Sequence, residues 1–230
     1  MTRPTLDVER RLWRAGHRWV AGIDEVGRGA WAGPLTVGVA VVHPGIRSRT
    51  IPYWLRDSKA IAEERREDVF PAVAAWCADA AVGHASAREC DRFGMTAAWR
   101  LAAYRGLAAL ELRPDAVVVD GPHDLLRDRA PAAPGAPAEE VPDLPPVAVP
   151  ATVLAIVDAD ARCAAVSAAS VIAKVVRDRL MREESVHFPA YGFETNKGYP
   201  SPRHQIALRG YGLSSIHRRS WTYVADLPVP

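Results

Sequence analysis

Apolar residues gather along this chain in short runs that stop abruptly at acidic residues or glycine. Runs of roughly four to eight apolar residues, rich in Val, Ile and Ala, are typical of buried strands. Longer stretches with apolar residues at helical spacing are typical of helices packed on one face. The pattern predicts strands near residues 18–24, 35–42, 79–86, 115–120 and 151–157, and helices near residues 60–77, 94–112 and 164–184.

The order of these elements predicts a mixed sheet. We expect short turns between the first strands, which makes them antiparallel, and helical crossovers between the last two, which makes them parallel. Helices would cover the faces of the sheet. A chain of 230 residues with 49% hydrophobic content can bury one substantial core. The expected fold class is α/β, with a main domain over residues 1–186 and a small helical appendage over residues 187–230.

The first strand ends on two adjacent carboxylates. Asp24 and Glu25 close its apolar run, and the turn Gly27-Arg28-Gly29 follows at once. Paired acids before a glycine-rich turn indicate a divalent metal beside a loop that contacts phosphate. The alternative is a solvated turn without a ligand, because Asp and Gly are also common in ordinary turns. The pair alone is a first indication of phosphodiester chemistry.

Two more acids occupy similar positions. Asp120 ends an apolar run and precedes Gly121, and an open α/β sheet usually places its site at such strand ends. Asp160 follows a third apolar run and lies just ahead of the helix predicted from about residue 164. Asp160 could instead be a helix N-cap or a first-turn charge, and Asp158 is a rival for its role.

Several segments together resemble a known family. Gly22-Ile23-Asp24-Glu25-Val26-Gly27-Arg28-Gly29, followed by Ala32-Gly33-Pro34, is similar to the opening signature of ribonuclease HII. Ordered blocks of this kind are far more specific than a lone Gly-Arg-Gly. The later blocks that agree in order are Asp57-Ser58-Lys59, Val119-Asp120-Gly121, Asp160-Ala161-Arg162, the stretch from Ser167 to Asp178, Lys197-Gly198-Tyr199-Pro200 and His217-Arg218-Arg219-Ser220.

The resemblance implies a ribonuclease H-like fold with a mixed five-stranded sheet. It also implies an endonuclease that cuts the RNA strand of RNA/DNA hybrids and incises duplex DNA 5′ to embedded ribonucleotides. The products would carry 5′-phosphate and 3′-hydroxyl ends, and the role would be ribonucleotide removal in DNA repair and replication. Residues 1–186 would then be the catalytic domain and residues 187–230 a substrate-binding appendage.

Asp24, Glu25, Asp120 and Asp160 are the expected catalytic residues and metal ligands. Gathered at one sheet edge, two such carboxylates would repel by up to about 4 kcal/mol at ~4 Å and an effective dielectric of ~20. Divalent cations would neutralise this repulsion. Two Mg²⁺ or Mn²⁺ ions could activate the attacking water and stabilise the leaving 3′ oxygen. Oxygen ligands favour these ions over zinc.

Other residues are expected to contact nucleic acid. Gly27, Arg28 and Gly29 match the family's sensor of the 2′-hydroxyl, the group that distinguishes RNA from DNA. Tyr199 matches the tyrosine that stacks on the sugar after the ribonucleotide, although without the resemblance it could equally be a packing residue. Lys59 and Lys174 are candidates for phosphate contacts.

The charge balance makes local basic patches important. The formal charge is only +2, from 29 basic and 27 acidic residues, so no overall basic field attracts nucleic acid. An excess of cations between Lys174 and Arg219, interleaved with aromatic residues, could follow a phosphate backbone. The alternative is a solvated helical face. The apolar stripe of the helix at 164–184 predicts that Lys174 and Arg177 lie near the border of its buried face.

The remaining features exclude other classes of site. Residues 122–150 are rich in proline and alanine, which is typical of an exposed loop insertion. Cys77, Cys90 and Cys163 form no Cys-x-x-Cys pair, which favours reduced thiols. No stretch is typical of a signal peptide or a bilayer span, so we expect a cytoplasmic protein without membrane association. With no evident partner-binding tail, we expect a monomer.

Two other functions remain open. Another metal nuclease of the same fold, such as a Holliday-junction resolvase or an integrase core, would also place carboxylates at strand ends. It would lack the Gly-Arg-Gly and Lys-Gly-Tyr-Pro pair. A catalytically silent hybrid-binding module would keep the fold without turnover, but such a module has no reason to crowd four acids together.

Overall fold

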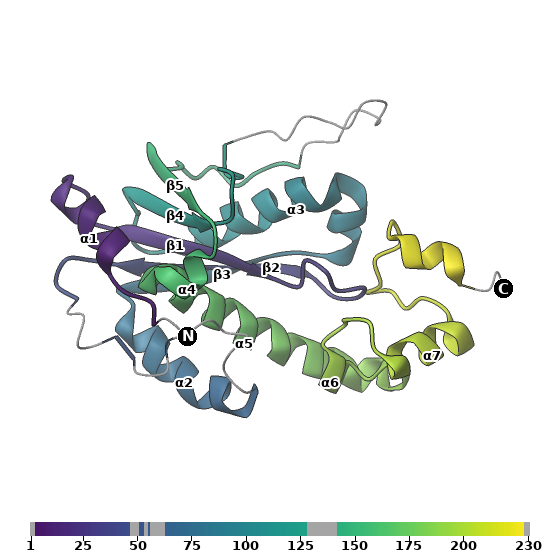
Figure 1. The fold of residues 1–230 in the computed structure, drawn as a ribbon. Helices are drawn as coiled ribbons and strands as arrows, with labels where there is room; N and C mark the ends of the chain where they lie inside the picture. The colour runs from purple at the N-terminus through teal and green to yellow at the C-terminus, as the bar shows by residue number, and fades with distance from the viewer. Residues whose placement is uncertain (1–2, 47–50, 53–54, 56–62, 128–141, 228–230) are drawn as a thin grey trace.

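A five-stranded sheet forms the centre of the computed structural model, which describes residues 3–46, 51–52, 55, 63–127 and 142–227 (Figure 1). The strand order is β3-β2-β1-β4-β5. β1 pairs antiparallel with β2, and β2 with β3, whereas β4 pairs parallel with β1 and with β5. The expected mixed sheet is confirmed. The strands are β1 (Val20–Val26), β2 (Leu35–Val42), β3 (Asp79–Ala85), β4 (Ala116–Asp120) and β5 (Thr152–Ile156).

The helices extend beyond those that the pattern predicts. The pattern does not place the short α1 or the C-terminal helices individually. α3 begins at Ala87 and is kinked at Gly94, where φ is +75°, so its second part begins where the pattern predicts a helix. Ser86 explains the early start, because its hydroxyl accepts from the Glu89 amide while the Glu89 carboxylate accepts from the Ser86 amide. The helices are α1 (Asp7–Arg14), α2 (Glu63–Trp76), α3 (Ala87–Ala109), α4 (Ala159–Arg162), α5 (Ala164–His187), η3 (Pro189–Tyr191), α6 (Phe193–Asn196), α7 (Pro202–Tyr211) and η4 (Thr222–Asp226).

Two expected connections differ in the structure. The link from β2 to β3 contains α2, which confirms the helix predicted near residues 60–77 but not the short turn expected between these strands. α2 packs on α5. For the link from β4 to β5, the parallel pairing predicts a helical crossover, whereas the composition of residues 122–150 predicts a loop. Its described parts, residues 121–127 and 142–151, contain no helix. The high proline content there disfavours a helix.

Helices cover both faces of the sheet. α3 lies on one face, and α5 lies on the other with α2 beside it (Figure 1). Along β1 the side chains alternate: Ala21 and Ile23 pack with the α3 residue Trp99, whereas Val20 packs with Val166 of α5. This alternation reflects the period of two in a β-strand.

α5 approaches β1 very closely. An added Cβ atom on Gly22 would lie only 2.2 Å from the carbonyl carbon of Ala165, so a larger residue there would push the helix away. The absence of a side chain lets the backbones touch. This close packing positions the next turns of α5, including Ser170, beside the end of β1.

The C-terminal residues form a small aromatic cluster of their own. Tyr191, Phe193 and Tyr223 pack against Met181 near the end of α5 and against Ala32 in the β1–β2 connection. The appendage is therefore attached to the two segments that flank the end of β1 (Figure 1). The domain division at residue 186 stays a prediction. None of the helices in the described part of the chain combines the length and apolar character needed to span a bilayer.

Candidate active site

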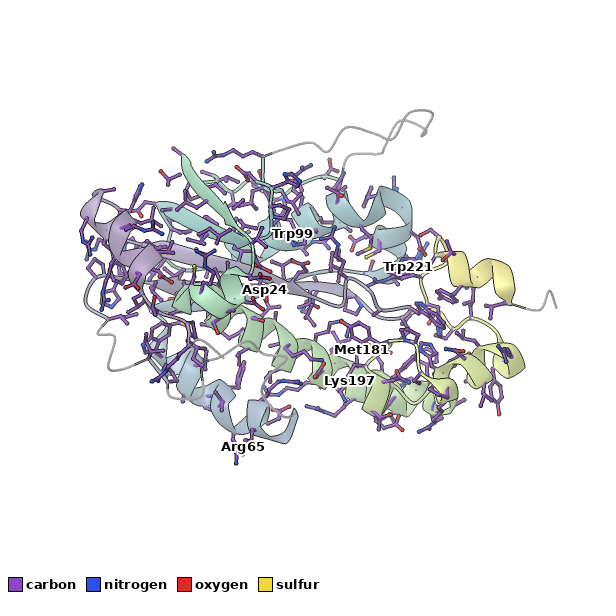
Figure 2. The ribbon with its side chains drawn as sticks, viewed as in Figure 1. Asp24, Arg65, Trp99, Met181, Lys197 and Trp221 are labelled. Carbon is purple, nitrogen blue, oxygen red and sulfur yellow. The ribbon has the colours of Figure 1, made fainter. Side chains whose placement is uncertain are left out.

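Asp24 and Glu25 point to opposite faces of the sheet. The Asp24 carboxylate is hydrogen-bonded by Ser170 of α5, whereas Glu25 accepts from the indole Nε1 of Trp99 on α3 at 3.0 Å. Figure 2 shows Asp24 below Trp99 near the middle of the molecule. Because successive side chains of a strand alternate, two adjacent acids must diverge in this way. Asp24 is therefore oriented by α5, and Glu25 by α3.

The pKa of Asp24 is raised far above its usual range. Its side chain is almost completely enclosed, with 7% exposure, and its Oδ1 accepts from the Glu25 amide at 2.8 Å. Burial raises the pKa of Asp24 to about 8, and the charges of Glu25, Asp120 and Asp160 act in the same direction, against the hydrogen bond from Ser170. Burial and nearby like charges both disfavour ionisation. Asp24 therefore lies in the electrostatic field of all three other candidates.

Asp120 and Asp160 are linked through a short helix. Asp120 ends β4, and its Oδ1 accepts from the amide of Ala159, the first residue of α4, at 2.7 Å. Asp160 lies in the first turn of that helix and is 6% exposed. The rival Asp158 is exposed and makes no side-chain cap at α4. Of the two aspartates, only Asp160 is buried toward the end of β1.

The donor chemistry of these four residues fits a hard divalent cation. All four offer carboxylate oxygens, the ligands that Mg²⁺ and Mn²⁺ prefer. Within the residues that the structure describes, no three His, Cys, Asp or Glu side chains converge closely enough to hold one ion.

The predicted 2′-hydroxyl sensor and the predicted sugar-stacking tyrosine are in direct contact. The amide of Gly27 donates to the hydroxyl of Tyr199 at 3.1 Å, across 172 positions of the sequence. Gly27 has a φ of +86°, which favours glycine. Arg28 extends outward and lies 3.5 Å from Glu25. The turn therefore connects the candidate catalytic acids to Tyr199.

Comparison with known proteins gives one consistent answer. The family model described as Ribonuclease HII matches residues 21–224. Ribonuclease HII of Streptomyces avermitilis is 45% identical over 226 residues, covering 98% of this chain and 86% of that protein. The chain belongs to the ribonuclease HII family. It is accordingly a ribonuclease H, an endonuclease and hydrolase that acts on RNA in hybrids.

Solved structures confirm the fold. Ribonuclease H2 from Pyrococcus horikoshii OT3 superposes with a TM-score of 0.70 at 30% identity, covering 90% of this chain and 96% of that chain. Bst-RNase HIII in complex with Mn²⁺ superposes with a TM-score of 0.67 at 21% identity, covering 91% of this chain and 68% of that chain, and this likeness concerns the fold alone.

Two buried arginines hold the ribonuclease HII turn in place. Arg218 donates to the carbonyls of Gly27 at 2.7 Å, Arg28 at 2.9 Å and Gly33 at 3.2 Å. Both Arg218 and Arg177 are 0% exposed, and burial lowers the pKa of each, to about 10 for Arg177. We call Arg177, Arg218 and their carbonyl partners the arginine clamp.

Arg177 completes the arginine clamp from α5. It donates to the carbonyls of Pro34 at 2.9 Å, Lys197 at 2.9 Å and Ala32 at 3.1 Å. The expectation that Arg177 lies at the border of the buried face is wrong, because the β1–β2 connection and the Lys197–Tyr199 segment cover that end of α5. The residue pattern of α5 alone could not predict the burial of Arg177, because the segments that cover it are distant in sequence.

Most cations of the Lys174–Arg219 stretch are engaged within the protein. Lys174 lies 2.5 Å from Asp178, and Lys197 is buried with its Nζ on the Glu194 carbonyl. Arg177, Lys197 and Arg218 are buried, so they are not part of a backbone-tracking surface, and the role of the exposed cations in this stretch stays a prediction. Arg179 and Arg182 pair with Glu67, and Arg203 pairs with Glu194. Lys59 lies outside the described residues, and a phosphate contact by Lys174 stays a prediction.

A buried histidine pair supports the tyrosine side of the turn. His204 donates from Nδ1 to the Tyr199 carbonyl at 2.9 Å, and its Nε2 lies 2.9 Å from Nε2 of His217. His217 Nδ1 accepts from the Ser214 amide at 2.9 Å. Only one proton fits between the two Nε2 atoms, so both rings are neutral. Burial lowers both pKa values, to about 3 for His217.

Proposed function

We propose that this ribonuclease H incises duplex DNA on the 5′ side of embedded ribonucleotides and cuts the RNA strand of hybrids, leaving 5′-phosphate and 3′-hydroxyl ends. Asp24, Glu25, Asp120 and Asp160 would hold divalent cations. The observation that best supports this proposal is the position of Asp24, which is buried in the field of three other acids. A protein has little reason to keep such repulsion unless cations relieve it.

The four acids would divide the work by position. When bound, Mg²⁺ or Mn²⁺ would lower the pKa of the attacking water and stabilise the leaving 3′ oxygen. Asp24, whose pKa is about 8, would have to release its proton to become an anionic ligand. Glu25 is oriented by Trp99, and Asp120 by the Ala159 amide. The Mn²⁺ complex of Bst-RNase HIII, a relative in fold, is consistent with this oxygen-rich site.

The Gly27–Gly29 turn would recognise the ribose. The Arg28 carbonyl accepts from Arg218 and keeps a second lone pair for a 2′-hydroxyl donor. The Gly27 carbonyl already accepts from both Arg218 and the Ala30 amide. Tyr199, fixed to the Gly27 amide, would stack on the sugar that follows. A deoxyribonucleotide offers no hydroxyl to this turn, so selectivity would come from a hydrogen bond left unmade.

Cleavage of a DNA duplex with one embedded ribonucleotide tests this proposal. The duplex is incubated with and without Mg²⁺ or Mn²⁺. An Asp24→Asn variant is assayed in parallel, and the other substrates are a long RNA/DNA hybrid, an all-DNA duplex and an all-DNA Holliday junction. We expect a cut 5′ to the ribonucleotide, only with metal and only by the unmodified protein. Cutting of the hybrid alone would refute the incision step, and cutting of an all-DNA Holliday junction would favour a resolvase.

A further inference from the structure

A basic hollow lies beside the Gly27–Gly29 turn. Its volume is about 600 Å³, and it opens between the beginning of α3 and the segment that carries Arg218. Arg218 lies between the lining residues His217 and Arg219 and donates to the Gly27 and Arg28 carbonyls, so the hollow is next to the turn. The lining residues are Arg88, Asp91, Arg92, Ser215, His217 and Arg219.

The fold brings these arginines together through one carboxylate. Asp91 accepts from the Arg219 amide at 2.8 Å and from the Ser220 amide at 3.0 Å and hydroxyl at 2.7 Å. These bonds join parts of the chain 128 positions apart and fix Arg219 next to α3. Both Asp91 oxygens are thereby used by donors of the C-terminal segment.

The charge of the hollow is predominantly positive. Arg88, Arg92 and Arg219 are exposed cations, whereas the buried His217 is neutral because its pKa is lowered to about 3. The nearby Glu89 is bound by Arg105 at 2.8 Å. Arg88 and Arg92 lie one turn apart near the start of α3, where like charges repel and the helix dipole disfavours cations. An anion in the hollow would relieve both effects.

We propose that this hollow binds backbone phosphates of the duplex that flanks the scissile nucleotide. This inference rests on the proposed function, because it assumes that the ribonucleotide is bound at the Gly27–Gly29 turn. Arg219 directly follows Arg218, whose guanidinium holds the Gly27 and Arg28 carbonyls of that turn. A nucleic-acid strand carries one phosphate for about every 3.4 Å of duplex length. A duplex at the turn thus has phosphates within reach of the hollow.

Salt-dependent binding tests the proposal. An Arg88→Ala/Arg92→Ala/Arg219→Ala variant is compared with an Arg11→Ala/Arg14→Ala/Arg18→Ala variant, whose exposed arginines lie around α1 at the opposite end of the molecule (Figure 1). Fluorescence anisotropy measures the Kd for a labelled RNA/DNA hybrid without divalent metal at several salt concentrations. Both variants lose the same charge, and thermal unfolding confirms that both are folded.

The hollow variant should bind at least about 10-fold more weakly at ~0.1 M salt, with the slope of log K against log salt reduced by about 2, whereas the control keeps the parent slope. Replacement of the three arginines by lysine should restore affinity within about 3-fold, because a phosphate contact needs charge more than a planar fork. Equal losses in both alanine variants, or none in either, would overturn the proposal.

The same assay separates this inference from the proposed function. Binding is measured without turnover and on hybrid, embedded-ribonucleotide and all-DNA duplexes in parallel. A parent protein that binds through the hollow but does not incise the embedded ribonucleotide refutes the proposed function and supports the hollow. If the parent incises normally and the hollow variant binds every duplex as tightly as the parent, the proposed function is supported and the phosphate-binding role of the hollow is refuted.

Discussion

Two neighbouring regions of this protein treat buried charge in opposite ways. At the end of β1, Asp24 is buried among three other acids, and its pKa is raised to about 8. In the arginine clamp, Arg177 and Arg218 are buried even more completely than Asp24, but each donates to three backbone carbonyls. The acids therefore repel one another, while the arginines are largely satisfied. The comparison teaches that the first region is arranged to gain a ligand and the second to hold a turn.

Replacing Asp24 in the acidic region should have the largest effect on activity. Asp24→Asn should lower kcat by more than the roughly 10–100-fold typical of residues that only orient metal ligands. It should also raise the Tm at pH 8 by at least about 3 °C. The folded-state pKa of Asp24 is raised, so its contribution favours folding below its unfolded pKa and is lost as pH rises toward 8.

Activity assays and calorimetry at pH 8 check these two effects together. Asp158→Asn is the matched control, because Asp158 is exposed and should change neither quantity. Normal turnover by Asp24→Asn would contradict a catalytic role for Asp24. An Asp24→Asn protein less stable at pH 8 than the parent would contradict the view that burying Asp24 lowers stability.

Removing Arg218 should destabilise the arginine clamp. Arg218→Ala leaves the carbonyls of Gly27, Arg28 and Gly33 without this donor, which should lower the free energy of unfolding by about 3 kcal/mol. Urea denaturation measures the loss. The exposed neighbour serves as control, since Arg219→Ala should stay within about 0.5 kcal/mol. Similar stabilities for the two variants would show that the clamp contributes little.

Acidic pH should lower the stability of the protein through the histidine pair, His204 and His217. His217 is neutral in the fold, with a pKa of about 3, so the unfolded chain takes up its proton first as pH falls below about 6.5. The free energy of unfolding should therefore fall by about 2 kcal/mol between pH 7 and pH 5. Urea titrations across this range measure it. His217→Gln should flatten the profile, whereas the exposed His187→Gln should leave it unchanged.

Removing the Tyr199 hydroxyl should have the smallest effect, and it tests the hydrogen bond between Tyr199 and the Gly27 turn that follows the acids. Tyr199→Phe keeps the ring but removes the hydroxyl that accepts from the Gly27 amide. A hydrogen bond of this kind contributes about 1 kcal/mol, so kcat/KM on an embedded ribonucleotide should fall about 5-fold. Steady-state kinetics test this, with the exposed Tyr211→Phe as control. A loss confined to Tyr211→Phe would contradict the assigned position of Tyr199.

Much of the fold could be predicted because its signals are local. The five strands and the long α5 follow from apolar runs and helical spacing, and the family blocks place Asp24, Asp120 and Asp160 at element ends. α1 was missed because it is short, and the start of α3 was missed because its capping box lies outside the apolar pattern. The roles of the four acids and of the Gly27–Gly29 turn stay predictions.

The sequence by itself determined where the acids stand along their strands, because the alternation and the ends of apolar runs are properties of adjacent residues. Only the tertiary structure decided which cations are buried. Arg177 and Arg218 resemble surface arginines until segments up to 191 positions apart close over them. The basic hollow likewise exists only because Asp91 joins α3 to the C-terminal segment. Burial and long-range contacts set these environments, and neither is a property of a short stretch of sequence.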